Sequence, residues 1–118
     1  NIAAASIAAI DLIAAEPARL KKLQDNADYF RAGMGKLGFD LLPGTHPIIP
    51  VMLYDAAKAK QMADQLLTEG VYVTAFSYPV VAQGKARIRT QMSAAHETKH
   101  LDRAIEAFGK VGKALRAV

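Results

Sequence analysis

The sequence predicts a small α/β (α+β) domain: a mainly antiparallel sheet with helices on one face, preceded by two helices. Two observations predict this class. Apolar residues recur every three or four positions in three longer segments, as in helices that bury one side. Three shorter segments are apolar or alternating and rich in β-branched and aromatic residues, as in strands. After the two opening helices, the predicted order is β-α-β-β-α.

The chain opens on an apolar, alanine-rich run, Ile2–Ile10, that contains no charge. Helices of this composition are typically interior ones, and a domain of 118 residues has little interior to offer. We therefore expect the run to be a helix that packs against another part of a longer protein. In this interpretation residues 1–118 are one small domain, and residues 1–16 are the end of its connection to a part of the protein that is missing.

Pro17 begins the second helix, because proline fits a first helical turn but not an interior. Gly38 is placed to end that helix. Its inward residues are predicted from their spacing to be Leu20, Leu23, Ala27, Phe30, Met34 and Leu37. Phe39–Leu42 is a possible short strand before the Pro43-Gly44 turn.

The next strand is Ile48–Leu53, which Pro50 restricts to a sheet edge or a bulge. Asp55 is the predicted N-cap of the following helix, and Gly70 its end. That helix has one apolar stripe, made of Ala59, Met62, Ala63, Leu66 and Leu67.

Two further strands, Val71–Phe76 and Ala86–Gln91, flank a loop from Ser77 to Lys85. The last helix begins near Thr98. Its inward residues are predicted to be Leu101, Ala104, Ile105, Phe108, Val111 and Leu115.

Composition excludes several classes of function. The absence of cysteine rules out disulfides, thiolate metal sites and a cysteine nucleophile, and is consistent with a reducing compartment. No positive charge precedes the opening apolar run, and Asp11 interrupts it, so it resembles neither a signal peptide nor a membrane span. The net charge of +4 is spread along the chain and indicates neither a nucleic-acid nor a membrane partner.

Two motifs are better explained by structure than by chemistry. Gly33–Gly38 matches G-x-G-x-x-G, but it comes at the end of a helix, whereas a dinucleotide site follows a strand and opens a helix. His96 and His100 are four residues apart, but His96 precedes the last helix and no third ligand is evident, so no metal site is predicted. His46 is separate in the sequence.

The strand Ala86–Gln91 carries the most informative side chains. Because residues two apart point the same way, Arg87, Arg89 and Gln91 share a face opposite Ala86 and Ile88. If Ile88 packs under the helices, both guanidinium groups face either solvent or a partner surface. A guanidinium clamps a carboxylate or a phosphate with two parallel hydrogen bonds.

Three segments resemble the C-terminal domain of the α-oxoamine synthases, which are pyridoxal-phosphate enzymes of the aspartate-aminotransferase (type I) fold. The segments are His46-Pro47-Ile48-Ile49-Pro50-Val51-Met52-Leu53, Tyr78-Pro79-Val80-Val81 with Gly84, and Ala86-Arg87-Ile88-Arg89-Thr90-Gln91-Met92-Ser93-Ala94-Ala95-His96. The third is the most specific, and the resemblance covers essentially the whole chain.

The resemblance implies an acyltransferase that condenses glycine with acetyl-CoA to 2-amino-3-oxobutyrate and CoA, or runs in reverse in threonine breakdown. It implies a cytoplasmic homodimer with pyridoxal phosphate as the electron sink. Arg89 matches the arginine that binds the amino-acid carboxylate, and Arg87 has a structural role. The loop from Tyr78 to Gly84 is expected to shape substrate access.

The cofactor-binding groups of this family lie in its large domain, so no catalytic or cofactor-binding residue is predicted in this chain. The lysines Lys21, Lys36, Lys58 and Lys85 lie outside the family's lysine motif. We therefore expect the 118 residues alone to be inactive.

Two alternatives stay open. One is a sister synthase that uses another amino acid or acyl-CoA, such as 8-amino-7-oxononanoate synthase. The other is a free-standing small binding or regulatory domain, whose coding region would lack an upstream pyridoxal-phosphate domain. For the arginine face itself the alternatives are a solvated strand face or, with Tyr72, Phe76 and Tyr78 as stacking groups, a nucleic-acid surface.

Overall fold

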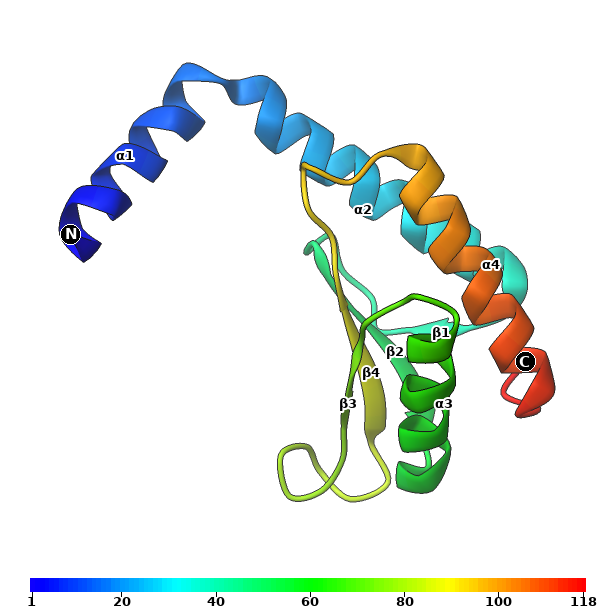
Figure 1. Cartoon of the computed structure of the whole chain (residues 1–118). Helices are drawn as coiled ribbons and strands as arrows, with labels where there is room; N and C mark the ends of the chain where they lie inside the picture. Colours follow the sequence, from blue (N-terminus) through cyan, green and yellow to red (C-terminus); the bar gives the residue numbers. More distant parts are fainter.

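A computed structural model describes the whole chain, Asn1–Val118, and confirms the predicted fold class (Figure 1). The chain forms four helices and one four-stranded sheet. The elements in order are α1 Ile2–Ala15, α2 Pro17–Leu37, β1 Asp40–Leu41, β2 Ile48–Tyr54, α3 Ala56–Thr68, β3 Thr74–Phe76, β4 Ala86–Gln91 and α4 Thr98–Ala114.

The helices begin and end at the residues that the sequence marks. Asp55 is the N-cap of α3, and its side chain accepts a hydrogen bond from the Lys58 backbone N–H at 2.7 Å. Gly38 ends α2 in the left-handed conformation, with a φ of 92°. Glu97 and His100 form a capping box that opens α4.

The strand order is β1-β2-β4-β3, and every pairing is antiparallel. The strand that contains Pro50 is therefore internal, and its register shift lies between Met52 and Tyr54, whereas the sequence predicted an edge or a bulge at Pro50. The second neighbour of this strand is the two-residue strand β1, which pairs only with Val51 and Met52 and not with Pro50. The Pro50 carbonyl accepts the Leu42 N–H at 3.1 Å, but proline has no N–H to donate in return. The Leu42 carbonyl accepts from Arg31 Nη1 at 3.0 Å instead.

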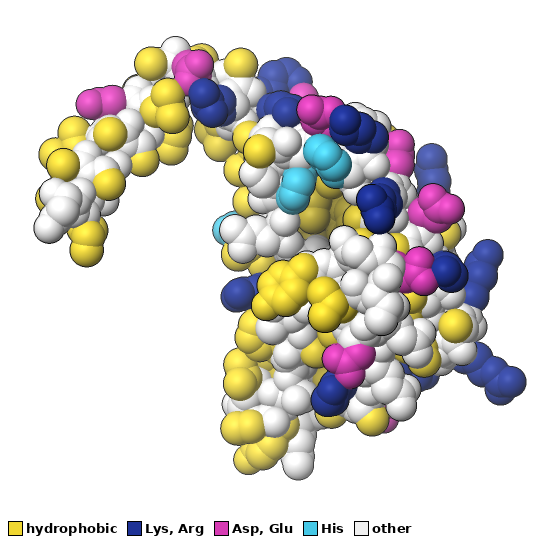
Figure 2. All heavy atoms as spheres, in the orientation of Figure 1, with side chains coloured by type: hydrophobic (Ala, Val, Ile, Leu, Met, Phe, Trp, Pro, Cys, Tyr) yellow, Lys and Arg dark blue, Asp and Glu magenta, His cyan; other side chains and the backbone are white.

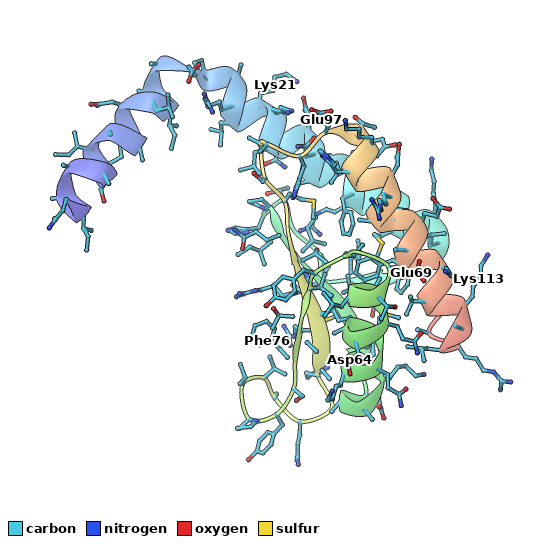
Figure 3. The ribbon with its side chains drawn as sticks, viewed as in Figure 1. Lys21, Asp64, Glu69, Phe76, Glu97 and Lys113 are labelled. Atoms are coloured by element: carbon cyan, nitrogen blue, oxygen red, sulfur yellow. The ribbon has the colours of Figure 1, made fainter.

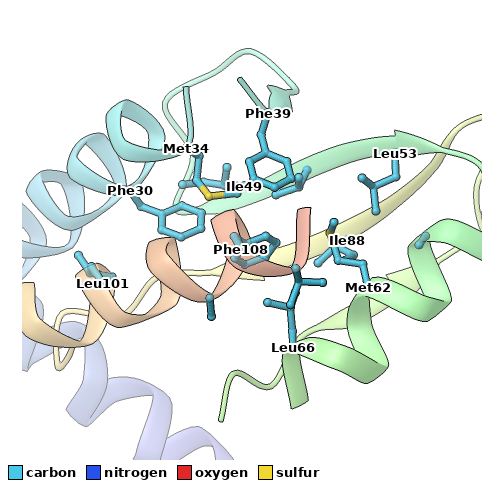
Figure 4. Packing of buried hydrophobic residues seen from close by; sticks show 14 of the residues in the cluster. Phe30, Met34, Phe39, Ile49, Leu53, Met62, Leu66, Ile88, Leu101 and Phe108 are labelled. Atoms are coloured by element: carbon cyan, nitrogen blue, oxygen red, sulfur yellow. The ribbon is translucent and has the colours of Figure 1, made fainter. Parts of the chain in front are cut away.

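The helices α2, α3 and α4 lie on one side of the sheet, and the core fills the space between them (Figure 1, Figure 4). Phe108 of α4 is fully buried and meets the rings of Phe30 and Phe39 edge to face, at centroid distances of 6.1 and 5.7 Å. The sheet contributes Ile49 and Ile88 to the same cluster. This core fixes which face of β4 is turned inward.

The strand β3 is three residues shorter than the predicted Val71–Phe76. The Val71 N–H instead donates to the Leu66 carbonyl at 2.8 Å, and the Gly70 N–H donates to that of Leu67 at 3.0 Å. These bonds close the end of α3, and Gly70 takes the left-handed φ of 85° that this cap needs. The chain reaches the sheet only after the cap. Likewise β1 is shorter than the predicted Phe39–Leu42, because the Phe39 N–H caps α2 through the Met34 carbonyl.

Two predicted inward leucines are exposed. Leu20 is 60% exposed because the first turns of α2 extend past the sheet, and Leu67 is 58% exposed at the border of the α3 stripe. The glycines of the G-x-G-x-x-G match lie at the end of α2, as predicted. Gly33 lets α4 approach α2 closely, since a Cβ at this position would collide with the Ile105 side chain.

The opening helix α1 forms an arm that extends away from the body of the domain (Figure 1). It contacts no element except α2, and none of its residues is buried. Its exposed side chains include Ile2, Ile7, Ile10 and Ile13. An exposed apolar surface of this kind marks an interaction site. The packing of α1 against another part of a longer protein stays a prediction.

Candidate functional site

The side of the sheet that carries no helix forms a mixed apolar and cationic surface beneath the α1 arm (Figure 1, Figure 2). We call it the open face. Figure 2 shows hydrophobic side chains along the margin that faces this space, with a Lys or Arg side chain projecting among them. By strand register, its members are Asp40, Ile48, Pro50, Met52, Thr74, Phe76, Arg87, Arg89 and Gln91. Tyr54 lies beyond a register shift in β2 and joins this surface through its hydrogen bond to Asp40.

Arg89 lies at the centre of the open face. It is exposed, whereas Ala86 and Ile88 of the same strand are buried on the helix side, as the alternation predicts. Its neighbours across the sheet are Pro50 on β2 and Thr74 on β3, neither of which is acidic.

The guanidinium of Arg89 is held by stacking and not by an ion pair. Its Cζ atom lies 4.8 Å from the centroid of the Phe76 ring, and Figure 3 shows Phe76 on the side of β3 that faces away from α3. It makes no salt bridge within 4.0 Å. The five N–H donors of this group are thus oriented by the ring and free to bind an oxyanion.

Arg87 and Tyr54 are tied down locally, unlike Arg89. The Arg87 Nε donates to the Lys85 carbonyl at 3.1 Å and so anchors the start of β4. The hydroxyl of Tyr54 donates to a carboxylate oxygen of Asp40, and this bond raises the Tyr54 pKa. Of the two arginines in the motif, the structure leaves only Arg89 without a hydrogen bond.

The loop between β3 and β4 lies at the end of the sheet and contains Tyr78, Val80 and Gly84. Tyr78 is 64% exposed and Val80 is 71% exposed, so neither contributes to the core. The loop thus presents apolar side chains beyond the end of the strands that carry Arg89 and Phe76. Its part in substrate access stays a prediction.

The sequence analysis missed Asn26, a buried residue of α2 that holds the turn following β4. Its Nδ2 donates to the carbonyls of Ser93 and His96, at 2.9 and 3.0 Å. The Nδ1 of His96 accepts the Ser93 N–H at 3.0 Å. This network ties the end of the Arg89 strand to α2. The only sequence signal for this role is that Asn26 is a polar residue on the apolar side of α2.

His96 makes stability dependent on pH. Burial lowers its pKa, and the charges of His100 on α4 and Lys22 on α2 lower it further. The unfolded chain then binds more protons than the folded one as the pH falls through about 6.5, the ordinary histidine value.

We expect the free energy of unfolding to decrease between pH 8 and pH 5.5, measured by urea denaturation. His96→Gln should make this decrease smaller. Ser93→Ala is the matched control, because it removes the hydroxyl that accepts the Ala95 N–H in the same turn but no titratable group. An equal pH dependence in wild type and His96→Gln would contradict the assignment.

No residues of this chain fit pyridoxal phosphate by themselves. A lysine that forms a Schiff base is commonly desolvated, but no lysine of the chain is buried. The glycines at Gly33–Gly38 end a helix, so they do not present N–H groups to a phosphate as a helix start does. No three potential ligands lie close enough together to hold a metal ion.

The fold defines a small α+β domain: a four-stranded antiparallel sheet with helices on one side and, on the other, an arginine without an acidic partner. The sequence profile of the family "Aminotransferase class I and II" matches residues 1–108. The chain belongs to this pyridoxal-phosphate-dependent family.

Curated relatives belong to the α-oxoamine synthases. The chain is 49% identical over 117 residues to 2-amino-3-ketobutyrate coenzyme A ligase of Escherichia coli K12, covering 99% of the chain and 29% of the relative. It is 47% identical over 110 residues to 8-amino-7-oxononanoate synthase of Fervidobacterium nodosum, covering 93% of the chain and 28% of the relative. The chain thus spans less than a third of the length of these relatives.

Solved structures confirm the fold. Serine palmitoyltransferase of Sphingomonas wittichii superposes with a TM-score of 0.79 at 25% identity, over 83% of this chain and 25% of that chain. The S. paucimobilis serine palmitoyltransferase with a bound PLP–myriocin aldimine gives 0.78 at 27% identity, again over 83% and 25%. None of the four helices is both long and apolar enough to span a membrane.

Proposed function

We propose that the chain is the C-terminal domain of an enzyme that condenses glycine with acetyl-CoA to 2-amino-3-oxobutyrate and CoA. The reverse reaction would serve threonine breakdown. The 49% identity to 2-amino-3-ketobutyrate coenzyme A ligase supports this activity. The observation that carries the proposal is Arg89, a guanidinium held against Phe76 on the open face without an acidic partner.

In this proposal Arg89 binds the glycine carboxylate. A rigid strand and a stacked ring orient the guanidinium before substrate arrives, which lowers the entropic cost of binding. Arg87 keeps the structural role that its bond to the Lys85 carbonyl indicates. The loop from Tyr78 to Gly84 borders the substrate path. Pyridoxal phosphate, the electron sink of the reaction, is held by the large domain.

The exposed α1 arm supports the proposed domain organisation. Residues 1–16 form the end of the connection to the large domain, which covers the apolar surface of α1. We further propose a cytoplasmic homodimer. The coding sequence upstream of Asn1 is expected to encode a large domain with the lysine that forms the Schiff base. An upstream region without such a domain would favour a free-standing binding module.

Substrate preference of the complete enzyme tests the proposed activity. We expect turnover of glycine with acetyl-CoA to exceed turnover with longer acyl-CoA thioesters, measured by release of free CoA. Alanine in place of glycine is the amino-acid control. The 47% identity to 8-amino-7-oxononanoate synthase makes that activity the second candidate. A preference for a long thioester with alanine would select it.

The isolated 118-residue chain is expected to bind no cofactor covalently, because none of its lysines is buried. Incubation with pyridoxal phosphate, reduction by borohydride and mass spectrometry should give no stoichiometric adduct on a single lysine. The complete enzyme, treated in parallel, should give one lysine adduct per chain, at a position outside residues 1–118. A single fully modified lysine among residues 1–118 would contradict the proposal that the large domain binds the cofactor.

A further inference from the structure

A cavity of about 470 Å³ lies on the helix side of the sheet and extends to the end of β4. It is bounded by the first half of α4, the segment between α3 and β3, and the end of β4. Its floor is apolar and includes Phe30, Leu101 and Phe108. Its volume falls in the range of about 300–1,000 Å³ that is typical of small-molecule sites.

The side chains of Arg103, His96 and His100 border this apolar floor, together with the polar residues Tyr72, Thr90 and Gln91. The guanidinium of Arg103 lines the cavity and makes neither a hydrogen bond nor a salt bridge within 4.0 Å. It rests on Gly70, where a Cβ would lie 3.1 Å from its Nη2. Glu69, the C-cap residue of α3, accepts instead from Lys110 Nζ at 2.6 Å.

The backbone fixes the two histidines of the cavity as further donors. The Nδ1 of His96 accepts the Ser93 N–H, and the Nδ1 of His100 accepts the Glu97 N–H, both at 3.0 Å. A neutral ring whose Nδ1 accepts must carry its proton on Nε2. Each ring therefore offers a free Nε2–H without needing a positive charge. Figure 2 shows histidine side chains beside a hollow with hydrophobic atoms on its floor.

The charges of the cavity have one sign. None of its lining residues is Asp or Glu, and Arg103 supplies a permanent positive charge. Lys22 of α2 adds a second positive charge near His96. Arg103 also borders a neighbouring hollow together with Glu69 and Glu106, neither of which lines this cavity. An anion in the cavity would meet no acidic side chain, and an apolar group attached to it could contact the floor.

We propose that this cavity is a binding site for a small organic oxyanion, a carboxylate or a phosphate monoester that carries an apolar group. The oxyanion binds Arg103 and the Nε2–H groups of His96 and His100, and the apolar group packs against Phe30 and Phe108. The site shares Gln91 with the open face but does not include Arg89, so the proposal does not depend on the proposed enzymatic function.

Nuclear magnetic resonance titration of the isotope-labelled 118-residue chain tests this proposal. The probes are hexanoate, hexyl phosphate, hexanol and inorganic phosphate. We expect saturable shifts of the ring signals of His96 and His100 with hexanoate or hexyl phosphate, and the tighter of the two identifies the preferred head group. Hexanol and inorganic phosphate should each bind at least about tenfold more weakly, because hexanol lacks the anionic group and inorganic phosphate lacks the apolar group.

Variants locate the effect. Arg103→Gln should weaken binding of the preferred probe by at least about tenfold. Lys113→Gln, which removes the same charge farther along α4, should change it by less than about twofold. Ala95→Trp places a bulky ring at an exposed lining position, so it should abolish binding while the fold persists. Equal affinity for hexanol, or shifts confined to α1, would overturn the proposal.

Discussion

Phe108→Ala is expected to lower the free energy of unfolding by about 3–5 kcal/mol. The ring is fully buried, and it joins α4 to α2 and to the chain entering β1 through its edge-to-face contacts with Phe30 and Phe39. Removing it leaves a cavity where these elements meet. Because the surrounding backbone is held by the sheet, the cavity cannot close fully. A loss of this size is a large part of the typical stability of about 5–15 kcal/mol.

Urea denaturation followed by circular dichroism measures this loss. Tyr72→Ala is the matched control, because it also removes an aromatic ring but from a side chain that is 82% exposed. We expect it to change the free energy of unfolding by less than about 0.5 kcal/mol. A Phe108→Ala protein as stable as Tyr72→Ala would show that the packing around Phe108 does not hold the domain together.

Arg89→Lys in the complete enzyme is expected to raise the KM for glycine by at least about tenfold, if Arg89 binds the substrate carboxylate as proposed. Lysine keeps the positive charge but replaces a planar fork of donors by a single ammonium group, so the two parallel hydrogen bonds to a carboxylate are lost. The KM for acetyl-CoA should stay nearly constant, because the thioester makes no use of this group.

Arg87→Lys is the control for Arg89→Lys, since it makes the same substitution two residues earlier on the same face of β4. It removes the Nε bond to the Lys85 carbonyl and should affect stability more than the glycine KM. Steady-state kinetics with glycine and acetyl-CoA varied separately distinguish the two effects. An unchanged glycine KM in Arg89→Lys would remove this residue from the substrate site.

Local sequence patterns predicted most of the secondary structure because their physical causes are local. The N-cap at Asp55 and the left-handed stops at Gly38 and Gly70 depend on backbone groups within one or two helical turns. The start of α3 follows directly from such a signal. The start of β3 was not predicted correctly from local patterns. The Val71 N–H donates to the Leu66 carbonyl in the α3 cap and is therefore not available to the sheet.

The candidate site was predictable for the same reason. Alternation along a strand places Arg89 opposite Ile88 whatever the neighbouring strands are, and one apolar residue is enough to choose the buried face. The stacking of Phe76 on Arg89 was not predictable. It requires β3 and β4 to pair in the observed register, which depends on the length of the loop and on the α3 cap.

By itself, the sequence determined the element order, the helix caps and the face on which Arg89 lies, since each depends on residues close together in the chain. Only the tertiary structure decided that α1 is an exposed arm, that Pro50 lies in an internal strand, and that Arg103 rests unpaired over Gly70 beside a cavity. Each of these properties is set by which distant segments come to lie beside the residue. The burial of a side chain, its hydrogen-bond partners and its free donors depend on this long-range packing, which the local spacing of apolar residues does not predict.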